Sequence, residues 1–122
     1  MTDAAQVAER FIALWNEPDG AVRKALLAKD WTDDAVYIDP MAAAKGADQI
    51  DAIIGCVHSR FPSFSFKLIG KADGYGDHVR FKWSLGPGDY VDAPIEGTDF
   101  VVIADGRIRS VSGFLDRVPA MA

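Results

Sequence analysis

Asp39 is the acidic side chain of this sequence that is best placed for proton-transfer chemistry. It closes the segment WTDDAVYIDP, Trp31 to Pro40, and the proline after it has no backbone N–H with which to extend a sheet. Alternation along Ala35 to Asp39 predicts a strand that carries Tyr37 and Asp39 on one face. If that face borders an apolar cavity, desolvation raises the pKa of the carboxyl group and suits it to act as a general base near neutral pH.

Two other side chains could assist Asp39. Tyr37 lies two strand residues away, roughly 7 Å along the backbone, and could present its phenol to the same substrate. The alternative for Tyr37 is a core aromatic with its hydroxyl at the rim, and the alternative for Asp39 is an Asp-Pro turn in solvent. His58 lies at the edge of an apolar helical stripe and could face inward, or it could have a polar role on a surface or interface. The candidate catalytic residues are therefore Asp39, Tyr37 and His58.

Helical periodicity is found on both sides of the predicted strand. Thr2 or Asp3 is placed to cap a first helix, and the turn residues at 18–20 precede a second, shorter one. The small residues at 41–45 predict a loop. A third helix is expected from Ala47 to Arg60, because its isoleucines and valine recur on one face and a proline follows it.

From Ser63 onward the apolar residues alternate, which predicts strands rather than helices. Turn residues at 73–76, at 86–88 and at Asp105-Gly106 divide this part into four strands. Helices followed by an antiparallel meander predict a single α+β domain over residues 1–122. In such a domain the helices cover one face of a curved sheet.

Composition excludes several classes of function. The formal net charge is −5 and the basic residues are scattered, which argues against binding to nucleic acid or to an anionic membrane surface. The N-terminus lacks the pattern of a signal peptide, and no apolar stretch approaches the length of a membrane span, so a cytoplasmic location is expected. Cys56 is the only cysteine, so no internal disulfide can form, and its spacing from the histidines matches no zinc pattern.

The order of elements resembles the nuclear transport factor 2-like superfamily, and most closely its SnoaL-like members. The resemblance rests on the YIDP strand end, the KGADQI helix start and the late run GTDFVVIADGRIRSVSGFLD, and it spans nearly the whole chain. It implies a cone in which a strongly bent, mainly antiparallel sheet wraps around three helices and leaves a pocket. The superfamily includes isomerases, dehydratases, epoxide hydrolases, polyketide cyclases and proteins without catalytic activity, so the resemblance does not name a reaction.

Ketosteroid isomerase is the functional template that the resemblance offers. Its general base is an aspartate before a proline at the end of the first strand, a position that Asp39 and Pro40 match. Its oxyanion donors are a tyrosine in the first helix and a neutral aspartate in a late strand. By this match Phe11 stands at the tyrosine position, and Thr98 or, less favourably, Glu96 stands at the acid position. Both donors are therefore missing at the matched positions. Because an oxyanion donor of this kind typically raises the rate by a factor of about a hundred to a thousand, a strict ketosteroid isomerase is not expected.

The same resemblance implies which residues form the wall of the pocket. Thr98 and Phe100 are placed on the pocket face, and Asp99 is then expected on the outer surface of the sheet. If Asp99 were buried, it would need an arginine partner such as Arg80, Arg107 or Arg109. The residues expected to contact a small hydrophobic molecule are Phe11, Trp15, Ile53, Val57, Phe81, Trp83, Thr98, Phe100 and Leu115.

Two classes of function remain after this comparison. One is an enzyme that moves a proton on an apolar cyclic molecule, as an isomerase, a cyclase or a dehydratase- or hydrolase-like lyase, without cofactor or metal. The other is a non-catalytic carrier or accessory domain. The missing donors favour this second class, whereas the retained Asp39-Pro40 position favours the enzyme. In either case a homodimer through the outer face of the sheet is expected, formed by His78, Arg80, Lys82 and Ser84 beside Ile95 or Val101.

Overall fold

The computed structural model describes residues 3–90 and 92–119, and within them three helices and six strands. In chain order these are α1 (Ala4–Asn16), α2 (Gly20–Asp30), β1 (Trp31–Ile38), β2 (Ala43–Lys45), α3 (Ala47–Arg60), β3 (Phe64–Tyr75), β4 (His78–Pro87), β5 (Ile95–Ala104) and β6 (Arg107–Arg117). None of the described helices is long and apolar enough to cross a membrane.

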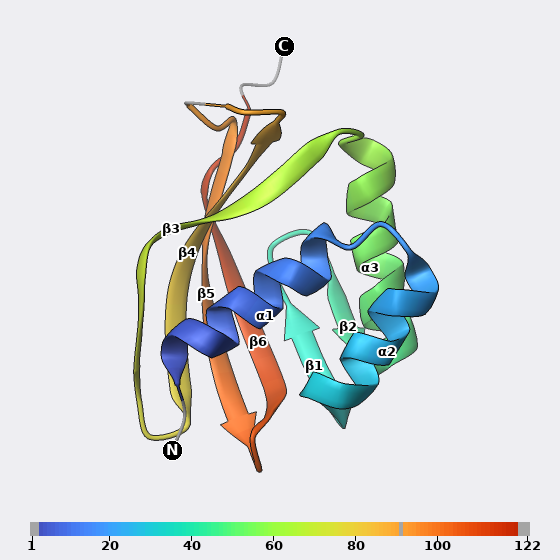
Figure 1. Cartoon of the computed structure of the whole chain (residues 1–122), viewed down its shortest axis with the longest axis vertical. Helices are drawn as coiled ribbons and strands as arrows, with labels where there is room; N and C mark the ends of the chain where they lie inside the picture. Colours follow the sequence, from blue (N-terminus) through green and yellow to red (C-terminus); the bar gives the residue numbers. More distant parts are fainter. Residues whose placement is uncertain (1–2, 91, 120–122) are drawn as a thin grey trace.

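The strands form one mixed sheet in the order β2-β1-β6-β5-β4-β3. The β1–β6 pair is parallel and the other pairs are antiparallel. In Figure 1 the sheet is strongly bent, α1 crosses one face of it, and α2 and α3 lie on the same side. The predicted α+β architecture, with helices on one face of a curved and mainly antiparallel sheet, is confirmed.

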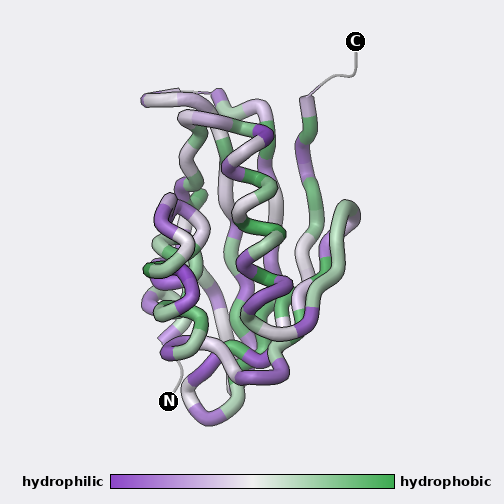
Figure 2. Tube along the Cα trace, turned by 90° about the vertical axis from the view of Figure 1, so that its right-hand side faces the viewer, coloured by the Kyte–Doolittle hydropathy of each residue, from purple (hydrophilic) through white to green (hydrophobic). Residues whose placement is uncertain are grey.

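Local sequence signals fix most of the helix boundaries. Asp3 caps α1 by accepting a hydrogen bond from the backbone N–H of Gln6, at 3.2 Å, whereas Thr2 lies outside the described residues. Asp19 caps α2 in the same way through Ala21. The bounds of α3 are those predicted. Its side chains alternate in hydropathy because only one side of the helix turns inward, as the upright helix at the centre of Figure 2 shows.

Strand β1 covers Trp31–Ile38 instead of the predicted Ala35 to Asp39, and β4 extends to Pro87, into the turn predicted at 86–88. Two segments predicted as loop or turn are also strands. The small residues after Pro40 do not form a simple loop, since Ala43–Lys45 pairs with the end of β1 as strand β2. Strand β3 continues through 73–75, where Tyr75 pairs with His78, so the turn is confined to Gly76 and its neighbour. In both places the pairing with a neighbouring strand outweighs the preference of small and polar residues for turns.

Aromatic rings of the helices and the sheet pack together in the core. The ring centroid of Phe11 lies 5.7 Å from that of Trp15 and 5.0 Å from that of Phe81. Trp15 in turn lies 5.4 Å from Tyr37 and 5.7 Å from Phe66. This contact network places α1 firmly against the sheet, on the side where the candidate residues of β1 are found.

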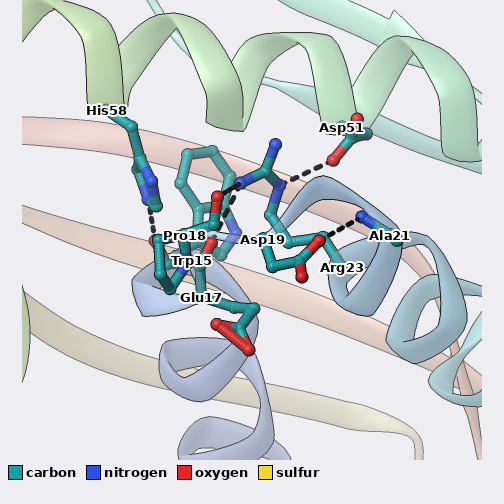
Figure 3. A network of polar contacts seen from close by, with 8 residues as sticks. All are labelled: Trp15, Glu17, Pro18, Asp19, Ala21, Arg23, Asp51 and His58. Atoms are coloured by element: carbon teal, nitrogen blue, oxygen red, sulfur yellow. Dashed lines mark hydrogen bonds and ion pairs between the residues drawn. The ribbon is translucent and has the colours of Figure 1, made fainter.

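A buried arginine ties the three helices to one another. Figure 3 shows the Arg23 side chain between the α1–α2 link and α3. Its Nε donates to the Asp51 carboxylate at 2.6 Å, and its Nη1 donates to the carbonyl oxygens of Glu17 and Pro18 at 2.9 and 3.1 Å. Arg23 is only 7% exposed, so these acceptors replace the water that its charge would otherwise bind.

We expect Arg23→Ala to lower the free energy of unfolding by about 3 kcal/mol, because it leaves the carboxylate and two carbonyl groups without their donor. Urea unfolding measures this loss. The control is Arg80→Ala, which breaks an exposed ion pair with Asp73 and should cost less than about 1 kcal/mol. Equal losses in the two variants would contradict a clamping role for Arg23.

Candidate functional site

A cavity of about 750 Å³ opens between α3 and the concave face of the sheet. Its described wall is mainly apolar, and it comes from α1, the end of β1, α3 and strands β3 to β6. The lining residues are Phe11, Trp15, Tyr37, Asp39, Met41, Ala42, Ala52, Ile53, Cys56, Val57, Arg60, Phe61, Phe66, Trp83, Leu85, Ile95, Asp99, Gly113, Phe114, Leu115, Val118 and Pro119. A cavity of this size accommodates a molecule of a few rings.

Asp39 lies at the cavity wall and also builds the turn that follows β1. Its Oδ1 accepts hydrogen bonds from the backbone N–H groups of Met41 and Ala42, both at 2.8 Å. Its own N–H donates to the Ala42 carbonyl oxygen at 2.9 Å. The aspartate is therefore held in one orientation, and it is only partly buried.

Tyr37 is on the same face as Asp39, as the alternation predicts, and the two side chains are hydrogen-bonded to each other. Its hydroxyl donates to Asp39 Oδ2 at 2.6 Å. Burial, followed by the hydrogen bond and the negative charge of Asp39, raises the pKa of Tyr37 far above that of an ordinary phenol. The phenol therefore stays protonated and positions the carboxylate.

Asp99 is a second acid on the cavity wall, although the sequence placed it on the outer face. The residue is 2% exposed, and among the described residues only the indole N–H of Trp83 approaches its carboxyl group as a donor. Burial raises the pKa of Asp99 to about 7, the nearby indole N–H of Trp83 opposes the rise, and the charge of Asp39 adds to it. That N–H acts as a nearby dipole, because it makes no well-formed hydrogen bond within the described part of the chain.

Gly113 on β6 is the backbone between the two acids. A Cβ atom built at Gly113 would lie 2.8 Å from Asp99 Oδ1 and 3.3 Å from Asp39 Cβ. Any side chain there would displace the Asp99 carboxyl group, since real Cβ atoms do not approach an oxygen so closely. The two acids are therefore neighbours across a residue that has no side chain.

Four of the predicted site residues lie elsewhere. Thr98 and Phe100 are on the outer face, where Thr98 donates to Asp116 and Phe100 is 43% exposed. Phe81 is buried in the core against Phe11 and does not line the cavity. The His58 ring nitrogen Nε2 contacts the Trp15 carbonyl oxygen at 2.6 Å, which fastens α3 to α1 outside the cavity. The other predicted contact residues, Phe11, Trp15, Ile53, Val57, Trp83 and Leu115, line it.

Thr98 and Phe100 were misplaced because the wrong one of the two alternating faces of β5 was taken to point into the cavity. Strand β5 contains apolar residues on both faces, and the match to a late-strand acid favoured the wrong one. Ile95, Val101 and Ile103 share the parity of Asp99, and all three are buried. This more strongly apolar parity is the signal in the sequence that could have placed Asp99 inside.

Two differently solvated carboxyl groups on one wall can divide the work of acid and base. Asp39, whose carboxylate accepts three hydrogen bonds, is placed to receive a proton. Asp99 can donate a hydrogen bond while it is protonated. The cavity wall thus has a buried acid from a late strand, Asp99, whereas the first helix contributes the rings of Phe11 and Trp15 to it. No arginine pairs with Asp99 within the described residues, and no group of three metal-ligating side chains is found among them.

Comparison with known proteins gives one family match and many structural ones. The family model of the SnoaL-like domain matches residues 8–111. A proposed isomerase of the SnoaL-like family from Agrobacterium tumefaciens is 38% identical, with 95% of this chain and 99% of that chain covered at a TM-score of 0.89. None of the curated proteins matches this chain.

Two more distant structures share the fold. A proposed SnoaL-like polyketide cyclase from Jannaschia sp. is 20% identical over 95% of this chain and 90% of that chain, with a TM-score of 0.69. A proposed ketosteroid isomerase from Kribbella flavida is 15% identical over 98% of this chain and 82% of that chain, with a TM-score of 0.70. At these identities the likeness concerns the fold alone.

The raised pKa of Asp99 makes the stability of the protein depend on pH. Because the folded state holds this proton up to about pH 7, its stabilising effect is complete below the usual pKa of 3.8 and is lost as the pH rises through 7. We therefore compare the free energies of unfolding of Asp99→Asn and the parent, measured with urea at each pH. We expect the advantage of Asp99→Asn to grow by about 3 kcal/mol between pH 5 and pH 8. Asp116→Asn, on the exposed outer face, is the control. A pH-independent difference for Asp99→Asn would rule out a buried, protonated carboxyl group.

Proposed function

Because this chain belongs to the SnoaL-like domain family, we propose that it binds a small, largely apolar carbonyl compound and moves a proton on it. The observation that carries this proposal is the pair Asp39 and Asp99 on one wall of an apolar cavity. The similarity to a proposed isomerase over nearly the full length of both chains supports the same class of reaction.

The proposed step divides the work between the two acids. The Asp39 carboxylate takes a proton from the carbon next to the substrate carbonyl, and the C–H electrons form the carbon–carbon double bond of an enolate. Protonated Asp99 donates a hydrogen bond to the oxygen on which negative charge develops. The proton held by Asp39 then returns to the same carbon or to a conjugated one, and the second outcome is an isomerisation.

Tyr37 is a positioning residue in this scheme. Its hydroxyl is bound to Asp39 Oδ2, which leaves the Oδ1 side to the turn N–H groups and fixes the plane of the carboxylate. A general base must lie within hydrogen-bond reach of the proton that it removes, so a fixed plane favours one substrate orientation.

A specific observation favours the alternative of a ligand carrier without catalysis. Asp39 accepts three hydrogen bonds, and two of them stabilise its own turn. Its fixed orientation therefore has a structural use as well. The first helix supplies Phe11, not a hydroxyl donor, to the cavity. Binding without proton transfer is the behaviour that distinguishes this alternative.

We also propose a homodimer through the outer face of the sheet. Ile95 and Val101, which the sequence assigned to that face, are buried in the core. The exposed apolar residues there are instead Val36 and Ile38 of β1, Phe100 of β5 and Phe114 of β6, at 40–56% exposure, and Phe114 also borders the cavity. The rings of Phe100 and Phe114 pack edge to face at 5.7 Å, and a second copy would cover them.

Proton transfer can be tested without knowing the substrate. We expect the protein to catalyse exchange of the α-hydrogens of cyclic ketones in D₂O, followed by NMR. Asp39→Asn should slow the exchange by a factor of about a hundred or more because the base is lost. Asp99→Asn should reduce it by roughly a hundred, and the parental rate should fall as the pH rises through about 7 and Asp99 loses its proton.

Asp116→Asn is the matched control for this experiment, since it removes one carboxylate from the outer face. If ketones bind, as tryptophan fluorescence reports, but exchange no faster than in buffer, the protein is a carrier. If Asp39→Asn unfolds readily while Asp116→Asn does not, the turn is the main role of Asp39.

The dimer is tested by light scattering at micromolar concentration. We expect a dimer mass for the parent and a monomer mass for Phe100→Glu, because a buried charge in the centre of the apolar patch would be unpaired. Val22→Glu changes an equally exposed residue on α2 and should leave the mass unchanged. A monomeric parent would remove the proposal.

A further inference from the structure

Asp99 combines deep burial with an unused hydrogen-bonding capacity. The residue is 2% exposed and borders the cavity, and among the described residues only the indole N–H of Trp83 approaches its carboxyl group as a donor. A buried carboxyl group with so few donors is costly, so its place at a cavity wall indicates a ligand that completes it. The protonated form suits a ligand oxygen, and the ionised form suits a ligand cation.

Aromatic rings surround the same end of the cavity. Trp15 lies 5.4 Å from Tyr37 and 5.7 Å from Phe66, and Phe66 lies 5.4 Å from Trp83, all between ring centroids. All four residues line the cavity. The faces of such rings attract organic cations, and the attraction increases where water is excluded.

We propose that this cavity is also a binding site for small hydrophobic organic cations, such as quaternary or protonated tertiary amines, whose ammonium group lies beside Asp39 and Asp99 against the aromatic rings. The inference concerns binding alone and stands whether or not the protein transfers protons. A cation of this kind would compete with the carbonyl compound of the proposed reaction for the same carboxyl groups.

The other charged and titratable groups around Asp99 favour a cation. Just after β1, Asp39 adds a second carboxylate, and Tyr37 of β1 keeps its proton because burial raises its pKa. On β4, Trp83 presents only an N–H, and α1 presents the rings of Phe11 and Trp15.

Helix α3 contributes Cys56 and Arg60 to the wall of the cavity, and both are exposed. Arg60 is the one cationic residue of the described wall. It belongs to the last turn of α3, where its charge is screened by water. Its opposition to a bound cation is therefore weaker than the attraction of two carboxyl groups in an apolar site.

The two kinds of ligand have opposite pH dependence. A carbonyl compound needs the proton of Asp99 and should bind less tightly as the pH rises through about 7. A cation needs the ionised form and should bind more tightly over the same range. Between pH 6 and pH 8 the ionised fraction rises from about one-tenth to about nine-tenths, so the affinity for a cation that requires it should rise about tenfold.

The probes are three molecules of nearly the same shape: choline, 3,3-dimethylbutan-1-ol and 3,3-dimethylbutanoate, which are cationic, neutral and anionic. Their binding is followed by NMR shifts of the tryptophan indole N–H groups. At pH 8 we expect choline to bind about tenfold more tightly than the neutral alcohol, and the anion to bind least. We expect the affinity for choline to fall about tenfold at pH 6.

Asp99→Asn should remove the pH dependence of choline binding, and Asp116→Asn should retain it, because both lose one carboxyl group but only the first loses it from the cavity. If Asp99→Asn does not fold, the three isosteric probes with the parent protein still decide the matter. Equal binding of choline and the neutral alcohol at pH 8 overturns the proposal, and so does a pH dependence that persists in a folded Asp99→Asn. Neither result depends on whether ketone exchange is observed.

Discussion

The attachment of α3 at two points is the constraint on which the cavity depends. Arg23 binds Asp51 near the start of this helix, and His58 contacts the Trp15 carbonyl near its end. These residues are seven positions apart, roughly 10 Å along a helix. On the same helix Ile50 and Ile54 are buried in the core, whereas Ile53 and Val57 face the cavity. The helix is thus fixed beside the sheet without being packed flat on it, and a space of ligand size is left open.

Burial divides two chemically identical side chains into different roles. Asp39 is partly exposed and accepts three hydrogen bonds, whereas Asp99 is enclosed and only the Trp83 indole N–H approaches it as a donor among the described residues. The donors stabilise charge on the first residue, and the lack of water disfavours charge on the second. The apolar wall therefore contributes to the chemistry of the site as directly as the carboxyl groups do.

The sequence predicted the elements better than it predicted the site. Local patterns that tertiary contacts did not override give the cap at Asp3, one of two candidates, the helix start at 18–20, the bounds of α3 and the shared face of Tyr37 and Asp39. Asp99 was misplaced because β5 is apolar on both faces, so alternation alone gives two phases. Strand β6 brings β5 close to the end of β1, because it lies between them, antiparallel to β5 and parallel to β1. No local pattern records that arrangement.

Gly113 shows that the arrangement of a site can depend on a residue that has no Cβ atom. The two carboxyl groups are adjacent only because the strand between them carries hydrogen where other residues carry carbon. A single added methyl group would displace the Asp99 carboxyl group without altering any functional group, so one nucleotide change can disturb the pair while every acid in the chain is kept. When related sequences are compared for this chemistry, the presence of both aspartates is informative only together with a glycine at this position.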